Sequence, residues 1–568
     1  MFEKVFEIVI LNRLEFISEA FNKSDRYNGG FTKGCRTSDN NFIIQGLVQR
    51  QLHLGKKLIV IHVDFSRAFD SVNRSILFYK LNKAGFRGRV IDTLFDLYNK
   101  TSFCMKVNGK VSEPIQETIG VNQGSITSPF LFKEYLSDLK SYLDTSTGVC
   151  IGDEILVHEL WADDLYMVSD EVKRSQKQLD GLKKFCAPNH MIANEVKTKF
   201  MVYGSKEKID LYLNGNKLHQ VDRYKSLGII LNTVQNVRGD IFKYNTEYLN
   251  NKARNAIFAI KQKTKSICKM PPNHWFHIYE SMIEPILLYG SDLWGVSAVC
   301  TADINKIYFW FMRIILSIKA TTSNLITMGE SGIIPPKTKC HTNAMLYFIR
   351  LNTMPEGSVV KQVFMELRRL HNLGYYTWYS RILELAKPYE LKLTDLQFGE
   401  NTKRNIKKCV KDKFINTWKS EISDLTSHPS LRTYNIFKQD FITEPYLSLI
   451  KKPKYVIALS RFRAGSHTLE VERGRYTNPR TPLHLRLCVI CQEVEDEKHF
   501  LIHCKMYEDK RKMLFNKIGE INPIFNQLNS HQKFVYLMTN TKEQQVTWIA
   551  KFVHDAMYER AVYHLQDN

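Results

Sequence analysis

The sequence predicts an α+β domain followed by a long helical region. Over about the first 230 residues, short apolar runs alternate with helical patterns, and beyond them the apolar spacing stays helical. The clearest strand is Leu58–Val63, whose unbroken apolar run is typical of a strand buried on both faces. In Glu159–Asp170, two adjacent acids, Asp163 and Asp164, lie between apolar runs. This second pattern predicts a β-hairpin with the acids at its turn.

Composition favours a nucleic-acid partner. The 568 residues include 80 Lys and Arg against 58 Asp and Glu, for a formal net charge of +22. Such an excess indicates a polyanionic partner, nucleic acid first and an acidic membrane surface second. The 11 scattered cysteines do not resemble a disulfide framework. No apolar run reaches the roughly 18 residues of a membrane span, and the first residues lack a signal-peptide layout, so an intracellular protein is expected.

The chain begins with a helical pattern over residues 1–20, followed by the Gly-rich basic loop Tyr27–Asn40 and another helix through Leu47. Asp64 ends the buried strand, where a charge is costly unless it has a partner such as a metal ion. Asp70 precedes the next apolar helical segment. We interpret Asp70 as the N-cap of that helix and not as a ligand.

The remaining elements of the first domain are predicted from turn signals and periodicity. In order, they are a hairpin at Asn108-Gly109, a helix whose first turn holds Pro129, the acidic hairpin, a helix over Leu179–Phe185, a turn and strand in Asn194–Gly204 and one further strand, Tyr224–Leu231. In such an α+β domain, the distant carboxylates of Asp64 and Asp163 can meet at one sheet edge.

A cluster of metal-ligand residue types lies near the end of the chain. Its members are Cys488, Cys491, His499 and Cys504. A Cys-x-x-Cys turn with a nearby His and Cys can close a tetrahedral zinc site, with His503 as the competing nitrogen ligand. The acidic run Glu493–Glu497 within this segment is expected to be a solvated tip.

Taken together, the motifs resemble the reverse transcriptases of non-LTR (LINE-type) retrotransposons. The polymerase motifs are, in order, "VDFSRAFD", "GVNQGSITSP", "WADD", "NEVKTKFMVYG" and "YKSLGIIL". Further on, "PILLYGSDLWG", "FRAGSHTLEVERGRY" and the Cys-His knuckle resemble the region after the polymerase in these elements. The resemblance implies a right-hand polymerase with partial fingers and palm (1–232), a thumb-like helical region (233–300), a helical linker (301–450) and a C-terminal region with a CCHC zinc knuckle (451–568).

The resemblance also implies an RNA-directed DNA polymerase that joins nucleotides to a primer 3′-hydroxyl by two-metal catalysis. Asp64 and Asp163, assisted by Asp164, would hold two Mg²⁺ ions, and the knuckle would hold one structural Zn²⁺. The implied partners are an RNA template, a DNA primer or target and deoxynucleoside triphosphates, in the nucleus and cytoplasm.

Further roles carry over by motif position. Phe69 corresponds to the residue beneath the nucleotide sugar, and Lys197 to a lysine that protonates the leaving pyrophosphate. The positions matching nucleotide, template or triphosphate contacts are Gln123, Gly124, Lys33 and Arg36.

The sequence departs from the family pattern at four positions. Trp161 replaces a tyrosine, Lys133 an asparagine, Thr32 an arginine and Cys35 another basic residue. The first finger motifs and the upstream endonuclease are missing, which predicts a reading frame truncated at its N-terminus. The alternative hypothesis is an inactive retroelement relic that only binds nucleic acid. An intron-encoded maturase fits less well, because its nuclease appendage has His/Asn pairs around its cysteines.

Overall fold

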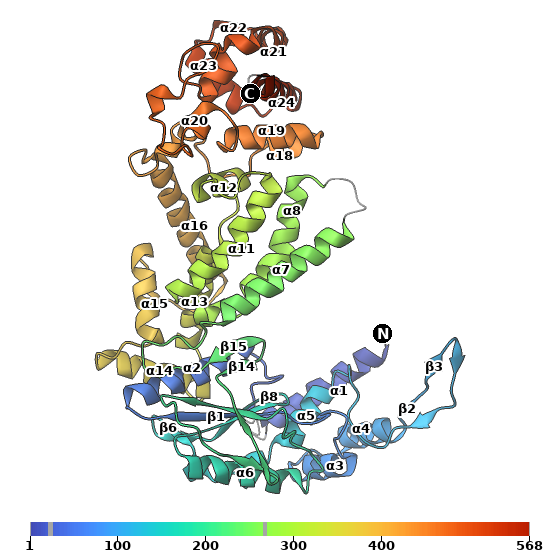
Figure 1. The fold of residues 1–568 in the computed structure, drawn as a ribbon. Helices are drawn as coiled ribbons and strands as arrows, with labels where there is room; N and C mark the ends of the chain where they lie inside the picture. Colours follow the sequence, from blue (N-terminus) through green and yellow to red (C-terminus); the bar gives the residue numbers. More distant parts are fainter. Residues whose placement is uncertain (1, 21–25, 265–269, 567–568) are drawn as a thin grey trace. The chain divides into compact units, whose positions relative to one another are not determined.

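The computed structural model describes residues 2–20, 26–264 and 270–566 and divides the chain into two compact units. The units comprise Met1–Asn245, Asp292–Val296 and Ala344–Phe398, and Thr246–Ser291, Ser297–Asn343 and Gly399–Asn568. The first unit is α+β and the second is helical, which confirms the predicted fold class (Figure 1). The chain returns to the first unit twice, so each unit is made of several separate stretches of sequence. The functional boundaries expected after residues 232, 300 and 450 remain predictions.

A five-stranded sheet forms the centre of the first unit, in the order β13-β10-β1-β9-β8. Its strands are β1 (Leu58–Val63), β8 (His158–Trp161), β9 (Asp164–Ser169), β10 (Lys199–Tyr203) and β13 (His219–Gln220). β1 pairs antiparallel with both β9 and β10, and all of its residues are buried. The predicted two-sided burial of this strand is therefore confirmed.

Among the residues that the structure describes, eight α-helices lie wholly within the first unit. They are α1 (Phe2–Ala20), α2 (Thr37–His53), α3 (Arg74–Lys83), α4 (Arg89–Asn99), α5 (Ser128–Leu136), α6 (Val172–Cys186), α14 (Val359–Asn372) and α15 (Trp378–Ala386). Two more, α10 (Ser291–Trp294) and α13 (Pro336–Asn352), contribute most or part of their length.

Helices cover both faces of the sheet. On one face, Ile59 and Ile61 pack into an apolar core with residues of α3, α5 and α6. On the other face, His62 lies opposite Tyr166, whose hydroxyl donates to the carbonyl of Asn40 in α2 (3.4 Å). Figure 1 shows α2 and α6 on opposite sides of β1. Both alternating sets of side chains therefore enter a core, which explains the unbroken apolar run.

α2 also packs closely against α14. A side chain at Gly46 would place its Cβ 2.2 Å from Val363 Cγ1, so only glycine permits this approach of the two helices. The segment that includes α14 was predicted to belong to a helical linker, and it packs within the α+β unit.

The first unit also contains five two-stranded ladders. They are β2 (Ser102–Phe103) with β5 (Ile115–Gln116), β3 (Lys106–Val107) with β4 (Lys110–Val111), β6 (Val149–Ile151) with β7 (Glu154–Leu156), β11 (Tyr212–Leu213) with β12 (Asn216–Lys217) and β14 (Arg223–Ser226) with β15 (Ile229–Asn232). The Asn108-Gly109 turn is confirmed, with φ of 49° and 82°. The prediction of one strand over Tyr224–Leu231 was wrong, because Leu227 (φ 46°) and Gly228 (φ 82°) turn the chain into the β14–β15 hairpin.

The second unit is built from helices that surround several buried ion pairs. They are α7 (Asn245–Lys263), α8 (Pro272–Ile278), α9 (Glu284–Leu287), α11 (Ala298–Leu316), α12 (Asn324–Ser331), α16 (Glu400–Ser423), α17 (Tyr434–Phe437), α18 (Tyr446–Leu449), α19 (Pro453–Arg463), α20 (Glu470–Arg473), α21 (Glu508–Ile521), α22 (Ile524–Gln527), α23 (Ser530–Met538) and α24 (Glu543–Gln566). Arg463 pairs with Glu330 (3.1 Å) and Glu444 (2.7 Å), and all three are largely buried.

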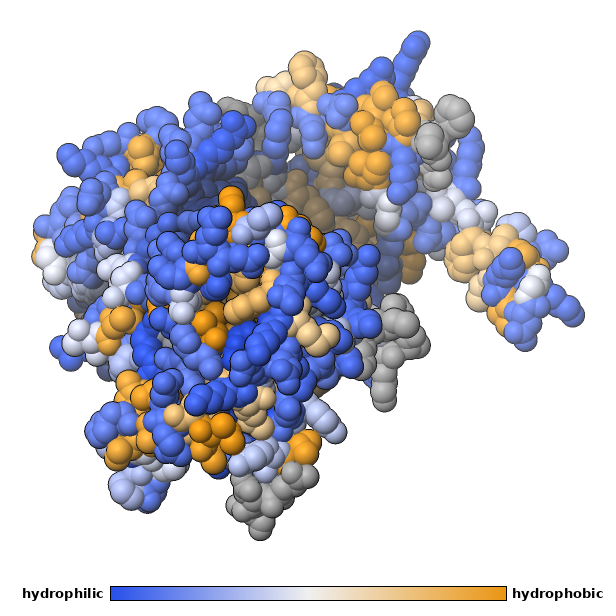
Figure 2. Space-filling model, turned by 90° about the horizontal axis from the view of Figure 1, so that it is seen from above, coloured by the Kyte–Doolittle hydropathy of each residue, from blue (hydrophilic) through white to orange (hydrophobic). Residues whose placement is uncertain are grey.

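The face of the molecule drawn in Figure 2 is predominantly hydrophilic, with apolar residues in separate groups. Within the described ranges, no helix combines the length and apolar character that crossing a bilayer requires.

Candidate active site and metal centre

Three carboxylates meet where β1 ends beside the β8–β9 hairpin. Val63 pairs with Leu165, and continuing this antiparallel register places Asp64 beside Asp164. Trp161 pairs with Asp164, so Ala162 and Asp163 form the two-residue turn of the hairpin. Ala162 adopts the left-handed conformation (φ 59°) that such a tight turn requires. The structure thus brings together acids that lie far apart in the sequence.

The charges at this edge interact strongly. Burial, followed by the neighbouring charges of Asp163 and Asp64, raises the pKa of Asp164 to about 6. Asp64 Oδ2 is buried and accepts no hydrogen bond from the described residues, and Lys197 Nζ lies 3.6 Å from it. Neighbouring acids, one of which has a buried oxygen that accepts no hydrogen bond from the described residues, suit a hard divalent cation such as Mg²⁺.

The turn before β10 holds Asp64 through its backbone. The Asp64 N–H donates to Thr198 Oγ1 (3.3 Å), and the Asp64 carbonyl accepts from the Asn194 N–H (2.7 Å). This turn also brings Lys197, assigned by motif position alone, to the carboxylate.

Three of the residues predicted to contact the nucleotide or template, Phe69, Gln123 and Gly124, lie on the loops that precede α3 and α5. Phe69 is half-buried and stacks on Phe132, with ring centroids 4.4 Å apart. Gln123 and Gly124 are exposed, and Gln123 Nε2 donates to Asp70 Oδ1 (2.8 Å).

The prediction that Asp70 caps the following helix was wrong. Turns extend the loop to Ser71, α3 begins at Arg74, and the Asn73 side chain accepts from the Ile76 N–H (3.1 Å). Asp70 is therefore free of the helix and holds Gln123 instead.

The Gly-rich loop packs directly on the acidic hairpin. The Gly29 N–H donates to the Leu160 carbonyl (3.0 Å). A Cβ at Gly30 would lie 2.1 Å from the Ala162 backbone nitrogen, and a Cβ at Gly29 would lie 3.1 Å from the Trp161 ring. These glycines allow the two backbones to approach, while Lys33 and Arg36 on the same loop remain exposed.

Two of the departures from the family pattern contact each other. Lys133 Nζ on α5 donates to Thr32 Oγ1 in the Gly-rich loop (2.8 Å). The loop lacks a basic side chain at position 32, and an ammonium group from α5 lies at that position instead. Two positions that depart from the expected pattern are thus joined by a hydrogen bond.

Sequence reasoning missed a buried contact that holds the Gly-rich loop. Arg350 in α13 donates to both carboxylate oxygens of Asp39 (2.6 and 2.8 Å) and to the Gly34 carbonyl (2.5 Å). Tyr347 donates to the same carboxylate (2.8 Å), which also accepts from the Arg36 N–H (2.8 Å). The Arg350 and Asp39 side chains are each 8% exposed, and no local pattern signals a pairing across 311 positions.

Tyr224 of the β14–β15 hairpin is a second residue that sequence reasoning missed. Its ring stacks on His62, with centroids 4.0 Å apart. Burial, followed by the charges of Asp164 and Asp64, raises the pKa of Tyr224 to about 12. The hairpin thus places an aromatic hydroxyl close to the acids.

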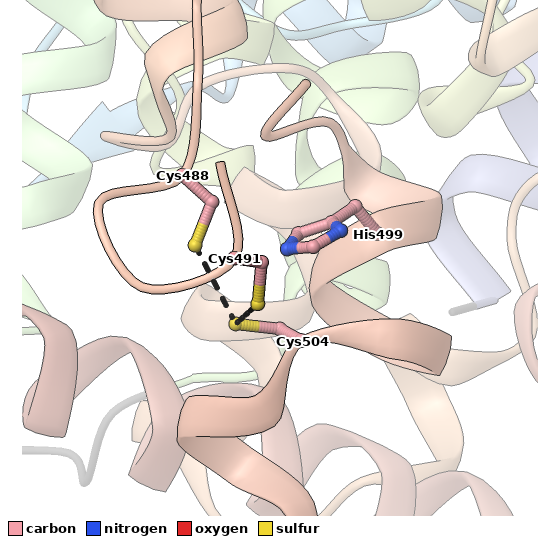
Figure 3. A group of neighbouring side chains, drawn as sticks. All are labelled: Cys488, Cys491, His499 and Cys504. Atoms are coloured by element: carbon pink, nitrogen blue, oxygen red, sulfur yellow. Dashed lines mark hydrogen bonds between the residues drawn. The ribbon is translucent and has the colours of Figure 1, made fainter. Parts of the chain in front are cut away.

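The predicted knuckle residues converge (Figure 3). One ligand atom from each of Cys488, Cys491, His499 and Cys504 lies within 4.8 Å of all the others. The Cys504 sulfur is 3.8 Å from that of Cys488 and 4.0 Å from that of Cys491. Zn–S bonds of about 2.3 Å in a tetrahedron imply sulfurs about 3.8 Å apart.

His499, and not His503, completes this set. Its Nδ1 lies 3.2 Å from Glu493 Oε2, while its buried Nε2 has no hydrogen-bond partner among the described residues. A carboxylate that holds the other ring nitrogen in this way is typical of zinc-bound histidines. His503 is exposed and lies outside the cluster. The donor set therefore fits zinc.

The expectation of a solvated acidic tip was wrong. Glu495 forms a buried pair with Arg560 (2.6 Å), and Glu497 lies 3.0 Å from His467 and accepts from Thr433 (2.7 Å). Burial favours the protonated Glu497, but the hydrogen bond and charge of His467 outweigh it and lower the pKa of Glu497 to about 2. Charges in this run fasten the knuckle to the rest of the second unit.

The sequence of the first unit is similar to a known protein family. Residues 2–231 match the family described as "Reverse transcriptase (RNA-dependent DNA polymerase)". This segment therefore matches a reverse transcriptase domain, and it lies within the α+β unit.

The predicted resemblance to non-LTR retrotransposon polymerases is confirmed. The chain is 23% identical over 371 residues to the RNA-directed DNA polymerase from mobile element jockey of Drosophila melanogaster, covering 62% of this chain and 39% of that protein. It is 22% identical over 287 residues to the Pol polyprotein from type-1 retrotransposable element R2 of Popillia japonica, covering 49% of this chain and 39% of that protein. The chain thus spans about two fifths of the length of these relatives.

Among solved structures, a telomerase from Candida Tropicalis in complex with a TWJ fragment of telomeric RNA matches with a TM-score of 0.33 and 10% identity. The match covers 75% of this chain and 56% of that chain. A score this low carries no functional argument.

The Arg350 contact leads to a prediction about the Gly-rich loop. Arg350→Gln should leave the Asp39 carboxylate buried without its cation, at a cost of roughly 3 to 5 kcal/mol in folding free energy. We expect backbone amides of residues 29–36 to exchange hydrogen at least about tenfold faster, as measured by mass spectrometry.

Arg50→Gln is the matched control. Arg50 pairs α2 with Glu366 of α14 (3.0 Å), in the same unit but away from the loop. If both variants accelerate exchange of residues 29–36 equally, Arg350 does not hold the loop specifically.

Proposed function

We propose that the chain is the polymerase portion of a non-LTR retrotransposon protein, an RNA-directed DNA polymerase that extends a primer 3′-hydroxyl. The observation that carries this proposal is the meeting of Asp64, Asp163 and Asp164 at one sheet edge within the reverse transcriptase domain. The substrates would be an RNA template, a DNA primer or target and deoxynucleoside triphosphates. The formal charge of +22 supports a nucleic-acid partner.

The three carboxylates would hold two Mg²⁺ ions. When bound, these ions would activate the primer hydroxyl and neutralise charge on the triphosphate. Asp64 follows a buried strand, and Asp163 lies in a tight turn. Ligands fixed in this way need little rearrangement during the reaction, which is the main condition for electrostatic catalysis.

The surrounding residues would bind and orient the nucleotide. Lys33 and Arg36, exposed on a loop that packs on the acidic hairpin, would contact the triphosphate. Lys133 would add a cation at Thr32. Lys197, at 3.6 Å from Asp64, would supply a proton to the leaving pyrophosphate.

Phe69 would form one wall of the site for the nucleotide sugar. Gln123 and Gly124 would lie beside the template and the incoming base. The stack of Phe69 on Phe132 supports this role, because it fixes the ring against the core and restricts the space beside it.

The first functional prediction tests the acidic edge. Asp64→Asn should lower primer extension on an RNA template at least about 100-fold, because one metal-holding charge is lost. RNA affinity should stay within about twofold, since it depends on Lys and Arg contacts to phosphate. Gel-based extension and fluorescence anisotropy measure the two quantities.

Asp153→Asn is the control for this experiment, because Asp153 is an exposed acid at the turn of another hairpin in the domain. Wild-type protein that binds RNA but extends no primer would support the inactive relic instead. Equal loss in both variants would contradict the assignment of Asp64.

The second functional prediction concerns sugar choice. Phe69→Val should raise incorporation of ribonucleotides relative to deoxyribonucleotides by about tenfold, because the shorter side chain leaves room for a 2′-hydroxyl. Single-nucleotide extension gives the ratio of kcat/KM values.

Phe130→Val serves as the control, since Phe130 is another partly buried ring against the same core. Both changes should lower stability by roughly 1 to 4 kcal/mol. If Phe69→Val keeps the wild-type ratio of ribonucleotide to deoxyribonucleotide incorporation, Phe69 is only a core residue and does not select the sugar.

The third functional prediction concerns the knuckle, for which we propose one structural Zn²⁺ held by Cys488, Cys491, His499 and Cys504. Elemental analysis of the full chain should find about one zinc per molecule. Cys488→Ser should remove it and lower the melting temperature of the second unit, because metal binding contributes directly to folding of such segments.

Cys104→Ser, at an exposed cysteine outside the cluster, should retain the metal. Zinc below about half an equivalent in the wild type, or zinc retained in Cys488→Ser, would rule out this site.

A further inference from the structure

A polar cavity in the second unit is surrounded by more cations than carboxylates. It encloses about 280 Å³. Its walls come from residues 319–326, residues 430–437, the end of α19 and the segment 472–476. No motif role predicted from the sequence accounts for it, although part of "FRAGSHTLEVERGRY" lines it.

Lys319 and Arg475 line the cavity, and Arg475 is one of three arginines whose charges repel Arg486 outside the lining. Burial, followed by repulsion from Arg480, Arg475 and Arg432, lowers the pKa of Arg486. Like charges gathered in this way raise the free energy of the folded state, and a bound anion would relieve the repulsion.

The acids that line the cavity are already paired. Glu472 lies 3.2 Å from Arg475 Nη1, and Glu497 is engaged by His467 and Thr433. Arg463, which also lines the cavity, is neutralised by Glu330 and Glu444.

Donor capacity therefore remains on the cavity wall. Lys319 Nζ donates to the His467 carbonyl (3.0 Å), which uses one of its three N–H groups. Arg475 pairs with Glu472 through Nη1, but its Nε is buried and has no hydrogen-bond partner among the described residues. Phosphate oxygens accept hydrogen bonds from ammonium and guanidinium groups such as these.

The remaining lining suits a nucleotide better than a free anion. Tyr476 is 63% exposed, and its hydroxyl lies 3.5 Å from Thr321 Oγ1. An exposed aromatic ring beside a cationic pocket is the arrangement that single-stranded nucleic-acid sites use, with the ring stacking on an unpaired base.

We propose that this cavity binds a phosphate of a single-stranded nucleic acid, with Tyr476 stacking on an adjacent base. The site would give the protein a contact to single-stranded nucleic acid outside the reverse transcriptase domain. It does not depend on polymerase activity, because all of its lining residues belong to the second unit.

The test uses the full chain with a single-stranded RNA of about 12 nucleotides, long enough for one such site. Hydrogen exchange of residues 319–323 and 463–476 should slow when the RNA binds. Arg475→Gln should abolish this protection and reduce the slope of log affinity against log salt by about one.

Arg473→Gln is the matched control. Arg473 is exposed, pairs with Glu470 (2.9 Å) and does not line the cavity. Arg473→Gln removes the same charge two positions away from Arg475. This variant should keep the RNA-induced protection from hydrogen exchange, and its RNA affinity should stay within about twofold of the wild type. Equal losses in the two variants would overturn the site.

Tyr476 provides a test that leaves the core untouched. Tyr476→Ala should weaken RNA binding about fivefold or more, whereas Tyr476→Phe should retain binding because the ring is kept. Inorganic phosphate is the second arm. If it protects the same segments as fully as RNA does, or if neither protects them, the strand site is overturned.

Discussion

The pairing of β1 on both of its edges is the constraint on which the rest of the first unit depends. β1 is buried on both faces, so its backbone groups need partners, and antiparallel β9 and β10 supply them. Once Val63 is opposite Leu165, the end of β1 has to lie beside the hairpin turn. A shift of one residue would send the apolar set of β9 to the wrong face, so burial also specifies the register. The positions of Asp64, Asp163 and Asp164 are thus a consequence of packing.

Around this edge, close backbone approach is combined with long-range ion pairing. Glycines at positions 29 and 30 let the basic loop contact the acidic hairpin; a side chain at position 30 would clash with the hairpin backbone, and one at position 29 would crowd the Trp161 ring. The other end of the loop is held through Asp39 by Arg350 and Tyr347, which come from α13. A helix more than 300 positions away in the sequence therefore helps to set the position of Lys33 and Arg36.

The second unit relies on buried charge in a different way. Glu495 and Glu497 flank the knuckle and pair with Arg560 and His467, so the segment around the cysteines is tied to α24 and to the residues after α19. The same Glu497 lines the arginine-surrounded cavity. The candidate zinc ligands, the buried ion pairs and the cavity are therefore parts of one packed region. Removing one partner of such a pair leaves an uncompensated charge in the interior, which is why these contacts are costly to break.

Local pattern was sufficient for much of this protein. The unbroken apolar run Leu58–Val63, the Asn108-Gly109 turn and the acids between apolar runs depend on short-range chemistry, and each element forms where it was expected. The Cys-x-x-Cys spacing likewise identified the residues that converge. Local pattern failed where two local solutions compete. Asp70 and Asn73 are both good cap residues, and the length of the preceding turns selected Asn73.

Tertiary structure decided the rest. From the sequence alone, a run of charged residues is expected to be exposed to solvent. The run Glu493–Glu497 is instead paired with Arg560 and His467, which lie outside it in the sequence. Similarly, neither Thr32 nor Lys133 reveals alone that the two side chains form a hydrogen bond. Elements arise from interactions over a few residues, so the sequence by itself determined the elements and the ligand types. Partners arise from packing between distant segments, so only the folded chain determined which charges are paired and which remain available to a ligand.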